Sequence, residues 1–405
     1  MKHQSIIKTL STLLIAIVVT LAFIGGGSSW PPTIHAQRGL RAPHTNNEVV
    51  VKLTPQANAK LFAQQHRLIA KQRIKANIYL FEMPANDSRS VQDVVDQVTR
   101  DRNTIWAEPH FLASIDQDEG DTDSDQRSGA SVDQRNTPFV DGQSPPSYFG
   151  QNALSLIRAQ HARQYASGAG VIVAVIDTGV DASHPAIGAI YPGWDFVNND
   201  ADPSEAGTGP AYGHGTHVAS IIKLIAPGAV IMPQRAFKAD GKGKTADIAN
   251  AIYNAVDYGA QVINMSFSMT TNSSNIREAV AYAANHGVVL VSTAGNTGTS
   301  AVRYPAFYLG VIGVAATDEY DRRASFSSYG VHVRASAPGV GIYGAYPGNQ
   351  WAWWSGTSFA APMVSGQAAL LISRGRSTNY IFTTAVPLPD SGMGSGRIDC
   401  LASVQ

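Results

Sequence analysis

Between residues 148 and 405, short apolar runs alternate with segments whose apolar residues recur at helical spacing. Four runs have the composition of buried strands: Val171–Ile176, Val262–Met265, Val288–Thr293 and Val311–Ala316. Four helices are predicted around them: His217–Ile225, Ala246–Tyr258, Asn275–His286 and Ser358–Ser373. This alternation predicts an α/β fold in which helices cover both faces of a parallel sheet. Such sheets bind ligands beyond the carboxyl ends of their strands.

Residues 47–115 show a second, smaller pattern. Val49–Leu53 and Ile78–Phe81 are rich in β-branched and aromatic residues and are predicted strands. Ala57–Ala70 is a predicted helix, and valines recur at helical spacing over Val91–Val98. The pattern predicts a small α+β domain. Because about 70 residues is marginal for independent stability, we expect this domain to need a partner surface.

Residues 1–36 have the pattern of an export signal. Lys2 and Lys8 precede an apolar run, Leu13–Ile24, of 12 residues, whereas a membrane-spanning helix needs roughly 20. A basic start, a short apolar centre and a small residue such as Ala36 are typical of a secretory signal peptide. The alternative is an uncleaved membrane anchor, and in both cases the remaining chain would lie outside the cytoplasm.

Composition narrows the function further. Six acidic residues lie within positions 116–125, and residues 116–147 are therefore an expected solvated linker, the kind of segment that proteases cut. The 30 Lys+Arg balance the 30 Asp+Glu, so the chain lacks the basic footprint of a nucleic-acid-binding protein. The single cysteine, Cys400, excludes an intrachain disulfide and a CxxC-type zinc or redox site.

Four polar residues stand at strand or helix ends, where an α/β sheet carries its chemistry. They are Asp177 after a strand, His214 before a helix, Asn296 after a strand and Ser358 at a helix start. Singly, each has an ordinary alternative as a helix cap or turn residue. Zinc binding by His214 and His217 is disfavoured because helical zinc pairs prefer i, i+4 spacing with a Glu. Together, their order in the chain is one in which Ser-His-Asp chemistry occurs.

On these motifs, residues 148–405 resemble the catalytic domain of the subtilisin-like (subtilase) serine peptidases over nearly its whole length. The matching stretches are Val173–His184, Gly213–Ala219, Val262–Ser266, Ala294–Gly298 and Gly356–Pro362. Residues 47–115, with Ala107-Glu108-Pro109 near their end, resemble the inhibitory propeptide of that family. The resemblance implies a secreted bacterial serine endopeptidase, made as a precursor whose propeptide assists folding, blocks the substrate site and is removed in or after the linker.

The resemblance also implies roles for single residues. Ser358 would attack the scissile carbonyl, His214 would carry the proton, and Asp177 would hold the imidazole. Asn296, together with the Ser358 backbone N–H, would stabilise the oxyanion. His184 and His217 match family positions that are not catalytic.

Subtilases bind peptide as an added strand, and the implied edges here are Gly241-Lys242-Gly243 and Ser266-Phe267-Ser268. Ser268 stands where many members carry Gly, and its side chain would narrow the primary pocket. Arg303 stands at a position that resembles the base of that pocket. Pointing inward, its guanidinium would favour an acidic residue on the acyl side of the cut. The alternative is that Arg303 extends to solvent.

No metal or other cofactor is expected. Relatives carry an Asp just after the His-Pro pair, where Ala186 stands here, and the loop between the His helix and Ala226-Pro227 is missing. Because hard cations need about six or more oxygens, we expect no high-affinity calcium at that position. A second oxygen-rich stretch is expected to be a solvated turn; its residues are Asp195, Asn198, Asn199, Asp200 and Asp202.

Two alternatives to an active serine endopeptidase stay open on the sequence. The first is a non-catalytic subtilase-like binding protein whose pocket is obstructed by Ser268 or Arg303. The second, an acid-acting relative with a carboxylate base, is disfavoured because His214 stands in its full motif. The expected partners are protein or peptide substrates and the chain's own propeptide as an intramolecular inhibitor, with no nucleic acid. A membrane is a partner only if the N-terminal segment stays uncleaved.

Overall fold

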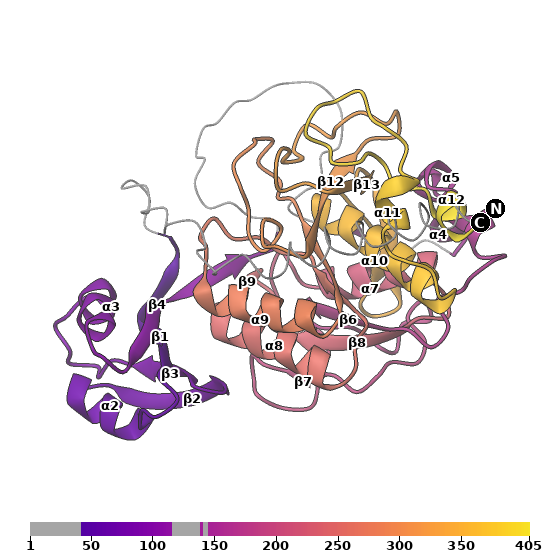
Figure 1. Cartoon of the computed structure of the whole chain (residues 1–405). Coiled ribbons are helices and arrows are strands. Elements are labelled where there is room, and N and C mark those ends of the chain that lie inside the picture. Colours follow the sequence, from indigo (N-terminus) through magenta and orange to yellow (C-terminus); the bar gives the residue numbers. More distant parts are fainter. Residues whose placement is uncertain (1–41, 116–137, 141–144) are drawn as a thin grey trace, which may run out of the picture. The chain divides into compact units, whose positions relative to one another are not determined.

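The computed structural model describes residues 42–115, 138–140 and 145–405 (Figure 1). The predicted signal segment, residues 1–36, and most of the predicted acidic linker lie outside the described residues. No helix in the described ranges is long and apolar enough to cross a membrane.

The larger part is built on a seven-stranded parallel sheet with the strand order β13-β12-β11-β10-β6-β8-β7. Its strands are β6 (Ile172–Asp177), β7 (Trp194–Asp195), β8 (Val230–Arg235), β10 (Val262–Met265), β11 (Val289–Thr293), β12 (Val311–Thr317) and β13 (Ala335–Pro338). The predicted α/β fold with a parallel sheet is confirmed. The four predicted strands, β6, β10, β11 and β12, agree with the structure to within a residue at each end.

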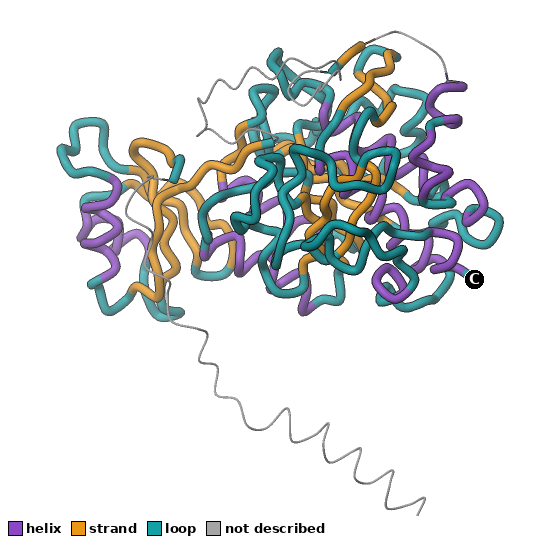
Figure 2. The backbone as a smooth tube through the Cα atoms, turned by 90° about the horizontal axis from the view of Figure 1, so that it is seen from above, coloured by secondary structure: helices purple, strands orange, loops and turns teal. Residues whose placement is uncertain are grey.

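Helices cover both faces of this sheet because successive strand residues point to opposite sides. In β6, Val173 and Val175 pack in one core with α7 (His214–Ile225) and α10 (Thr357–Ser373). Ala174 and Ile176 pack in a second core with α8 (Thr245–Asp257) and α9 (Ser274–Asn285). The two helix layers lie on either side of the strands in Figures 1 and 2.

Helix α7 begins three residues earlier than the apolar pattern predicts. Gly213 at its N-cap has φ 84°, a left-handed conformation that favours glycine, and His214 is the first helical residue. The His-Gly-Thr start of the helix lacks an apolar repeat, so periodicity alone placed the beginning at His217. The earlier start fixes His214 at the N-terminal end of a buried helix.

The N-terminal part is a separate antiparallel sheet of order β2-β3-β1-β4, to which β9 is added at the β4 edge. Its elements are β1 (His44–Leu53), α2 (Ala59–His66), β2 (Ile69–Lys75), β3 (Ile78–Glu82), α3 (Val91–Thr99) and β4 (Thr104–Ser114). One face, including Val49 and Val51, packs against α2 and α3. The opposite face, including Val50 and Leu80, packs in the same core as α8 and α9.

The helix predicted over Ala57–Ala70 is wrong beyond His66. Arg67 has φ 55° and ends α2, and the chain then turns into strand β2 at Ile69. The sequence from Ile69 onward has apolar residues too sparse to mark a strand, because most of β2 is exposed. Its pairing with β3 supplies the strand that local pattern did not indicate.

A third, smaller sheet includes two exposed residues of the predicted linker, residues 116–147. Strand β5 (Phe139–Val140) pairs antiparallel with β15 (Gln350–Trp354), which in turn pairs with β14 (Ile342–Tyr346). Polar composition did not predict that Phe139 and Val140 pair with a Trp-rich hairpin.

The remaining helices are short. They are α4 (Pro145–Gly150), α5 (Asn152–Leu156), α6 (Ala159–Ala162), α11 (Tyr380–Thr383) and α12 (Cys400–Val404).

Candidate active site

Asp177 and His214 form a buried hydrogen-bonded pair at the carboxyl end of the parallel sheet. Asp177 is the last residue of β6 and His214 the first of α7, and His214 Nδ1 lies 2.8 Å from Asp177 Oδ1. The Thr178 backbone N–H donates to the same carboxylate oxygen at 2.8 Å. A carboxylate at Nδ1 favours the tautomer that carries its proton there, which presents Nε2 as a base.

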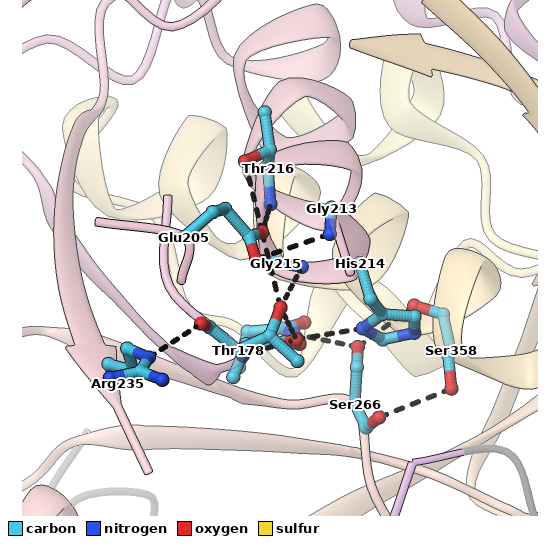
Figure 3. A network of polar contacts seen from close by, with 11 residues as sticks. Thr178, Glu205, Gly213, His214, Gly215, Thr216, Arg235, Ser266 and Ser358 are labelled. Carbon is cyan, nitrogen blue, oxygen red and sulfur yellow. Dashed lines mark hydrogen bonds and ion pairs between the residues drawn. The ribbon is translucent and has the colours of Figure 1, made fainter. Parts of the chain in front are cut away.

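Ser358 lies at the N-terminal end of α10, beside the ring of His214. The His214 ring packs against Phe359, the next residue of the helix, and against Trp354, with centroids 5.2 and 5.4 Å apart. Ser358 Oγ donates to the Ser266 carbonyl at 3.2 Å, and Ser266 Oγ donates to the Ser358 carbonyl at 2.8 Å (Figure 3). The sheet and two helix ends thus bring a hydroxyl, an imidazole and a carboxylate into one place.

Asn296 lies in the loop that follows β11 and is tied to the same helix end. Its Oδ1 accepts from the Thr357 backbone N–H at 2.9 Å and from Thr357 Oγ1 at 2.8 Å. These two hydrogen bonds fix the amide with Nδ2 as its donor end, next to Gly356. A side-chain N–H and the partial positive charge of a helix N-terminus are therefore directed to one region.

Glu205 joins this network, although it was not among the predicted site residues. Its carboxylate accepts hydrogen bonds from the Gly213 N–H at 3.2 Å and from the Thr216 N–H and Oγ1 at 3.1 Å each. Thr178 Oγ1 also donates to it at 3.1 Å, and Thr178 is next to Asp177 in the chain (Figure 3). Burial, followed by the charge of Asp177, raises the pKa of Glu205 to about 7. The one signal in the sequence is an acid eight residues before a helix that lacks a side-chain cap.

Because the pKa of Glu205 is raised in the folded protein, the native state holds its proton more tightly than the unfolded chain does. Its contribution to stability is therefore present below pH 4.5 and is lost as the pH rises from 4.5 towards 7. We expect Glu205→Gln, which cannot titrate, to gain stability relative to the parent across this window. Thermal unfolding at several pH values, with Ser358→Ala in both proteins to prevent self-digestion, measures this. Parallel profiles would contradict it.

The two predicted substrate edges lie on either side of the end of β4. Strand β9 (Lys242–Lys244) pairs with it on one side, and Ser268 pairs with Ser114 on the other. At Gly243 an added Cβ would lie 2.6 Å from the Phe237 ring, which in turn packs on Phe267 with centroids 4.9 Å apart. The structure thus brings together all the residues predicted for these edges, with the N-terminal part of the chain between them.

Arg303 does not extend to solvent, which corrects one of its two predicted orientations. The residue is only 8% exposed, and its Nη2 donates to Thr297 Oγ1 at 3.2 Å, next to Asn296. The solvent-exposed alternative rested on the usual behaviour of arginine. It fails here because the aliphatic part of the side chain packs over Gly295, where an added Cβ would lie 3.0 Å from Arg303 Cγ.

The oxygen-rich stretch at Asp195–Asp202 is also not simply a solvated turn. Asp195 is buried, forms an ion pair with the buried Arg235, and accepts hydrogen bonds from the backbone N–H groups of Val197 and Asn198. Composition predicted solvation, but Arg235 at the end of β8 supplies the counter-charge. Among the described residues, no group of three or more His, Cys, Asp or Glu is arranged to hold a metal ion.

His184 and His217 hydrogen-bond elsewhere than the group of Asp177, His214 and Ser358. His217 Nε2 lies 3.1 Å from the Ala352 carbonyl, and burial lowers the pKa of this histidine to about 3. His184 Nε2 lies 2.9 Å from the Gln350 carbonyl, and burial lowers its pKa as well. Both side chains therefore act as neutral hydrogen-bond donors that hold strand β15.

Comparison with known proteins identifies the family to which the chain is similar. Residues 168–384 match the model of the subtilase family. Thermitase of Thermoactinomyces vulgaris is 41% identical over 266 residues, which are 62% of this chain and 94% of that protein. A thermophilic serine proteinase of Bacillus sp. strain AK1 is 45% identical over 235 residues, 55% of this chain and 57% of that protein.

A solved structure extends the likeness over more of the chain. Fervidolysin from Fervidobacterium pennivorans, a keratinolytic enzyme related to subtilisin, superimposes with a TM-score of 0.73 at 27% identity. The match covers 91% of this chain and 62% of fervidolysin. The parallel sheet, the Asp-His pair at its carboxyl edge and these relatives agree, and the chain belongs to the subtilase family as a serine endopeptidase.

Proposed function

We propose that the chain is the precursor of a self-processing serine endopeptidase in which Ser358, His214 and Asp177 form the catalytic triad. The observation that carries the proposal is the 2.8 Å bond between His214 Nδ1 and Asp177 Oδ1, beside the helix end that bears Ser358. A base held in this tautomer beside a serine is the arrangement that nucleophilic acyl transfer requires.

In this mechanism Ser358 Oγ attacks the carbonyl carbon of the peptide bond while His214 Nε2 takes the hydroxyl proton. Asn296 Nδ2 and the Ser358 backbone N–H donate to the resulting oxyanion. The carbon–nitrogen bond then breaks, and His214 returns the proton to the leaving amine. Water repeats the sequence on the acyl-enzyme, which releases the acid and restores Ser358. Asp177 stabilises the imidazolium in both halves.

We further propose that residues 47–115 are an inhibitory propeptide that occupies the substrate edges. Support comes from the end of β4, which pairs with Lys242–Lys244 and hydrogen-bonds Ser268 in both directions. A substrate peptide cannot use those edges while β4 does. Residues 1–36 would direct export, and cutting within residues 116–147 would separate the propeptide from the peptidase domain, residues 148–405.

The full chain and its Ser358→Ala variant, expressed in parallel and followed by intact mass spectrometry, test the proposal. We expect the unaltered chain to lose its N-terminal part and to gain one adduct from a fluorophosphonate, and the variant to do neither. An unaltered chain that stays intact, takes no label and cuts no peptide after the linker is cleaved by an added protease would contradict it. That result would favour a non-catalytic binding protein.

Asn296→Ala is expected to lower kcat by about 10²–10³-fold with little change in KM, since its amide donates to charge that develops only in the transition state. Steady-state kinetics on a peptide substrate after removal of the N-terminal part measures this. Asn272→Ala, in the loop before α9, is the matched control and should leave kcat unchanged, because its side chain accepts only from the Arg277 side chain in the described structure. An equal rise in KM for Asn296→Ala would instead indicate a role in binding.

A further inference from the structure

The end of β4 shows the path that a peptide takes to the proposed triad. Ala113 pairs with Gly243, and the Ile115 N–H donates to the Gly241 carbonyl at 2.9 Å. On the other edge, Ser114 and Ser268 exchange two backbone hydrogen bonds of 3.0 and 2.9 Å. The segment is therefore the middle strand of an antiparallel arrangement, with its register fixed on both sides.

That register identifies which peptide residue reaches Ser358. In an antiparallel pair, each step forward on one strand is matched by a step back on its partner. Consider a peptide that follows the path of β4, with one residue opposite Ser268 as Ser114 is. The peptide residue two positions further on then lies opposite Ser266. Ser266 is the residue that hydrogen-bonds Ser358 in both directions. The peptide residue opposite Ser266 is therefore the one whose carbonyl Ser358 attacks.

Arg303 lies beside this position. Tyr304 exchanges hydrogen bonds of 2.7 and 3.0 Å with Met269, which follows Ser268 directly, so Arg303 borders the strand that receives the peptide. From the other direction, its side chain packs on Gly295 and donates to Thr297. Arg303 thus contacts the Asn296 loop through its side chain, its neighbour Tyr304 pairs with the residue after Ser268, and Arg303 is largely withdrawn from water.

A cation in such surroundings selects for a carboxylate, because a charge-assisted pair gains strength where water is excluded. The chain's own sequence agrees. The residue two positions after Ser114 is Asp116, the first of the six acids in positions 116–125. Two independent observations therefore indicate a preference for an acidic residue. One is the arginine beside the peptide position, and the other is the acid at the matching place in the sequence.

We propose that Arg303 gives this protease a preference for Asp or Glu immediately before the bond that it cuts. The proposal rests on the proposed function, since it assigns a substrate class to the same triad. Arg303 acts by pairing with the side chain of the bound peptide and takes no part in the proton transfers. Both oxygens of a carboxylate fit the two N–H groups on one edge of a guanidinium.

The test is a set of peptides that differ only in the residue before the scissile bond: Asp, Glu, Asn, Gln, Ala and Phe. We expect kcat/KM for Asp or Glu to exceed that for the isosteric amides by roughly 10- to 100-fold. Arg303→Met should abolish this preference, and Arg303→Lys should keep part of it. Arg322→Met is the matched control, because Arg322 pairs with Asp318 on an exposed turn.

The outcomes separate this proposal from the proposed function. Fluorophosphonate titration counts competent Ser358 before each assay. A labelled enzyme that prefers Phe or Ala over Asp and Glu, or whose acidic preference survives in Arg303→Met, overturns the role of Arg303 alone. An enzyme that takes no label and cuts none of the peptides overturns the triad instead. If Arg303→Met fails to fold, the unaltered chain still decides the question. The comparison is then between its kcat/KM for peptides with Asp or Glu and its kcat/KM for peptides with Asn or Gln before the scissile bond.

Discussion

His214→Ala is expected to lower kcat for peptide hydrolysis by on the order of 10⁶-fold, a magnitude known for the corresponding loss in subtilisin, a member of the same family. In the proposed mechanism this change removes both the base that accepts the Ser358 proton and the acid that protonates the leaving amine. The ring also packs against Trp354 and Phe359, but its removal there affects stability rather than the chemical step. KM should change little, because the backbone edges proposed to bind peptide are untouched.

Steady-state kinetics on one peptide, with enzyme concentration taken from fluorophosphonate-reactive Ser358 in the parent, measures the effect. The variant will not process itself, so parent and variant are first cut in the linker by an added protease and separated from the N-terminal part. His217→Ala is the matched control, since His217 is equally buried on the same helix and packs on the same two rings. A similar loss of kcat in both variants would show that the effect comes from disturbed helix packing and not from lost proton transfer.

The strands and helices around the active site could be predicted from the sequence because burial leaves a strong pattern. Val262–Met265 is apolar except for Asn264, since both faces of a central parallel strand are covered, and its predicted bounds agree with the structure at both ends. Strand β8 has no such pattern, because Pro233, Gln234 and Arg235 interrupt it. Arg235 is buried there only because Asp195, 40 positions earlier, neutralises it.

Non-local pairing explains most of what the sequence could not show. Exposed residues dominate β2, and Lys242–Lys244 is a strand through its pairing with β4, which is distant in the sequence. The same limit applies to the site. Asp177, His214, Asn296 and Ser358 stand in recognisable motifs, but Glu205 lies in a loop without one. Its role depends on where the chain brings Gly213 and Thr216, which no local pattern records.

Asp177→Asn is expected to lower kcat by about 10⁴-fold at neutral pH, while peptide binding stays close to normal. An asparagine at this position retains the shape of the carboxylate and one oxygen acceptor. It can also present an N–H to His214 Nδ1, which would move the imidazole proton to Nε2 and remove the base that faces Ser358. The same change removes the negative charge that stabilises the imidazolium. Both consequences fall on kcat.

Asp181→Asn provides the comparison, because Asp181 lies four residues further on and its carboxylate accepts hydrogen bonds from Ser183 and from the distant Gly348 N–H. Its kcat should stay within a few-fold of the parent. The distinguishing measurement is the reaction of Ser358 with a fluorophosphonate, which should slow in step with kcat in Asp177→Asn if the nucleophile has lost its base. Unchanged labelling together with slow peptide hydrolysis would place the role of Asp177 after acylation and contradict the tautomer argument.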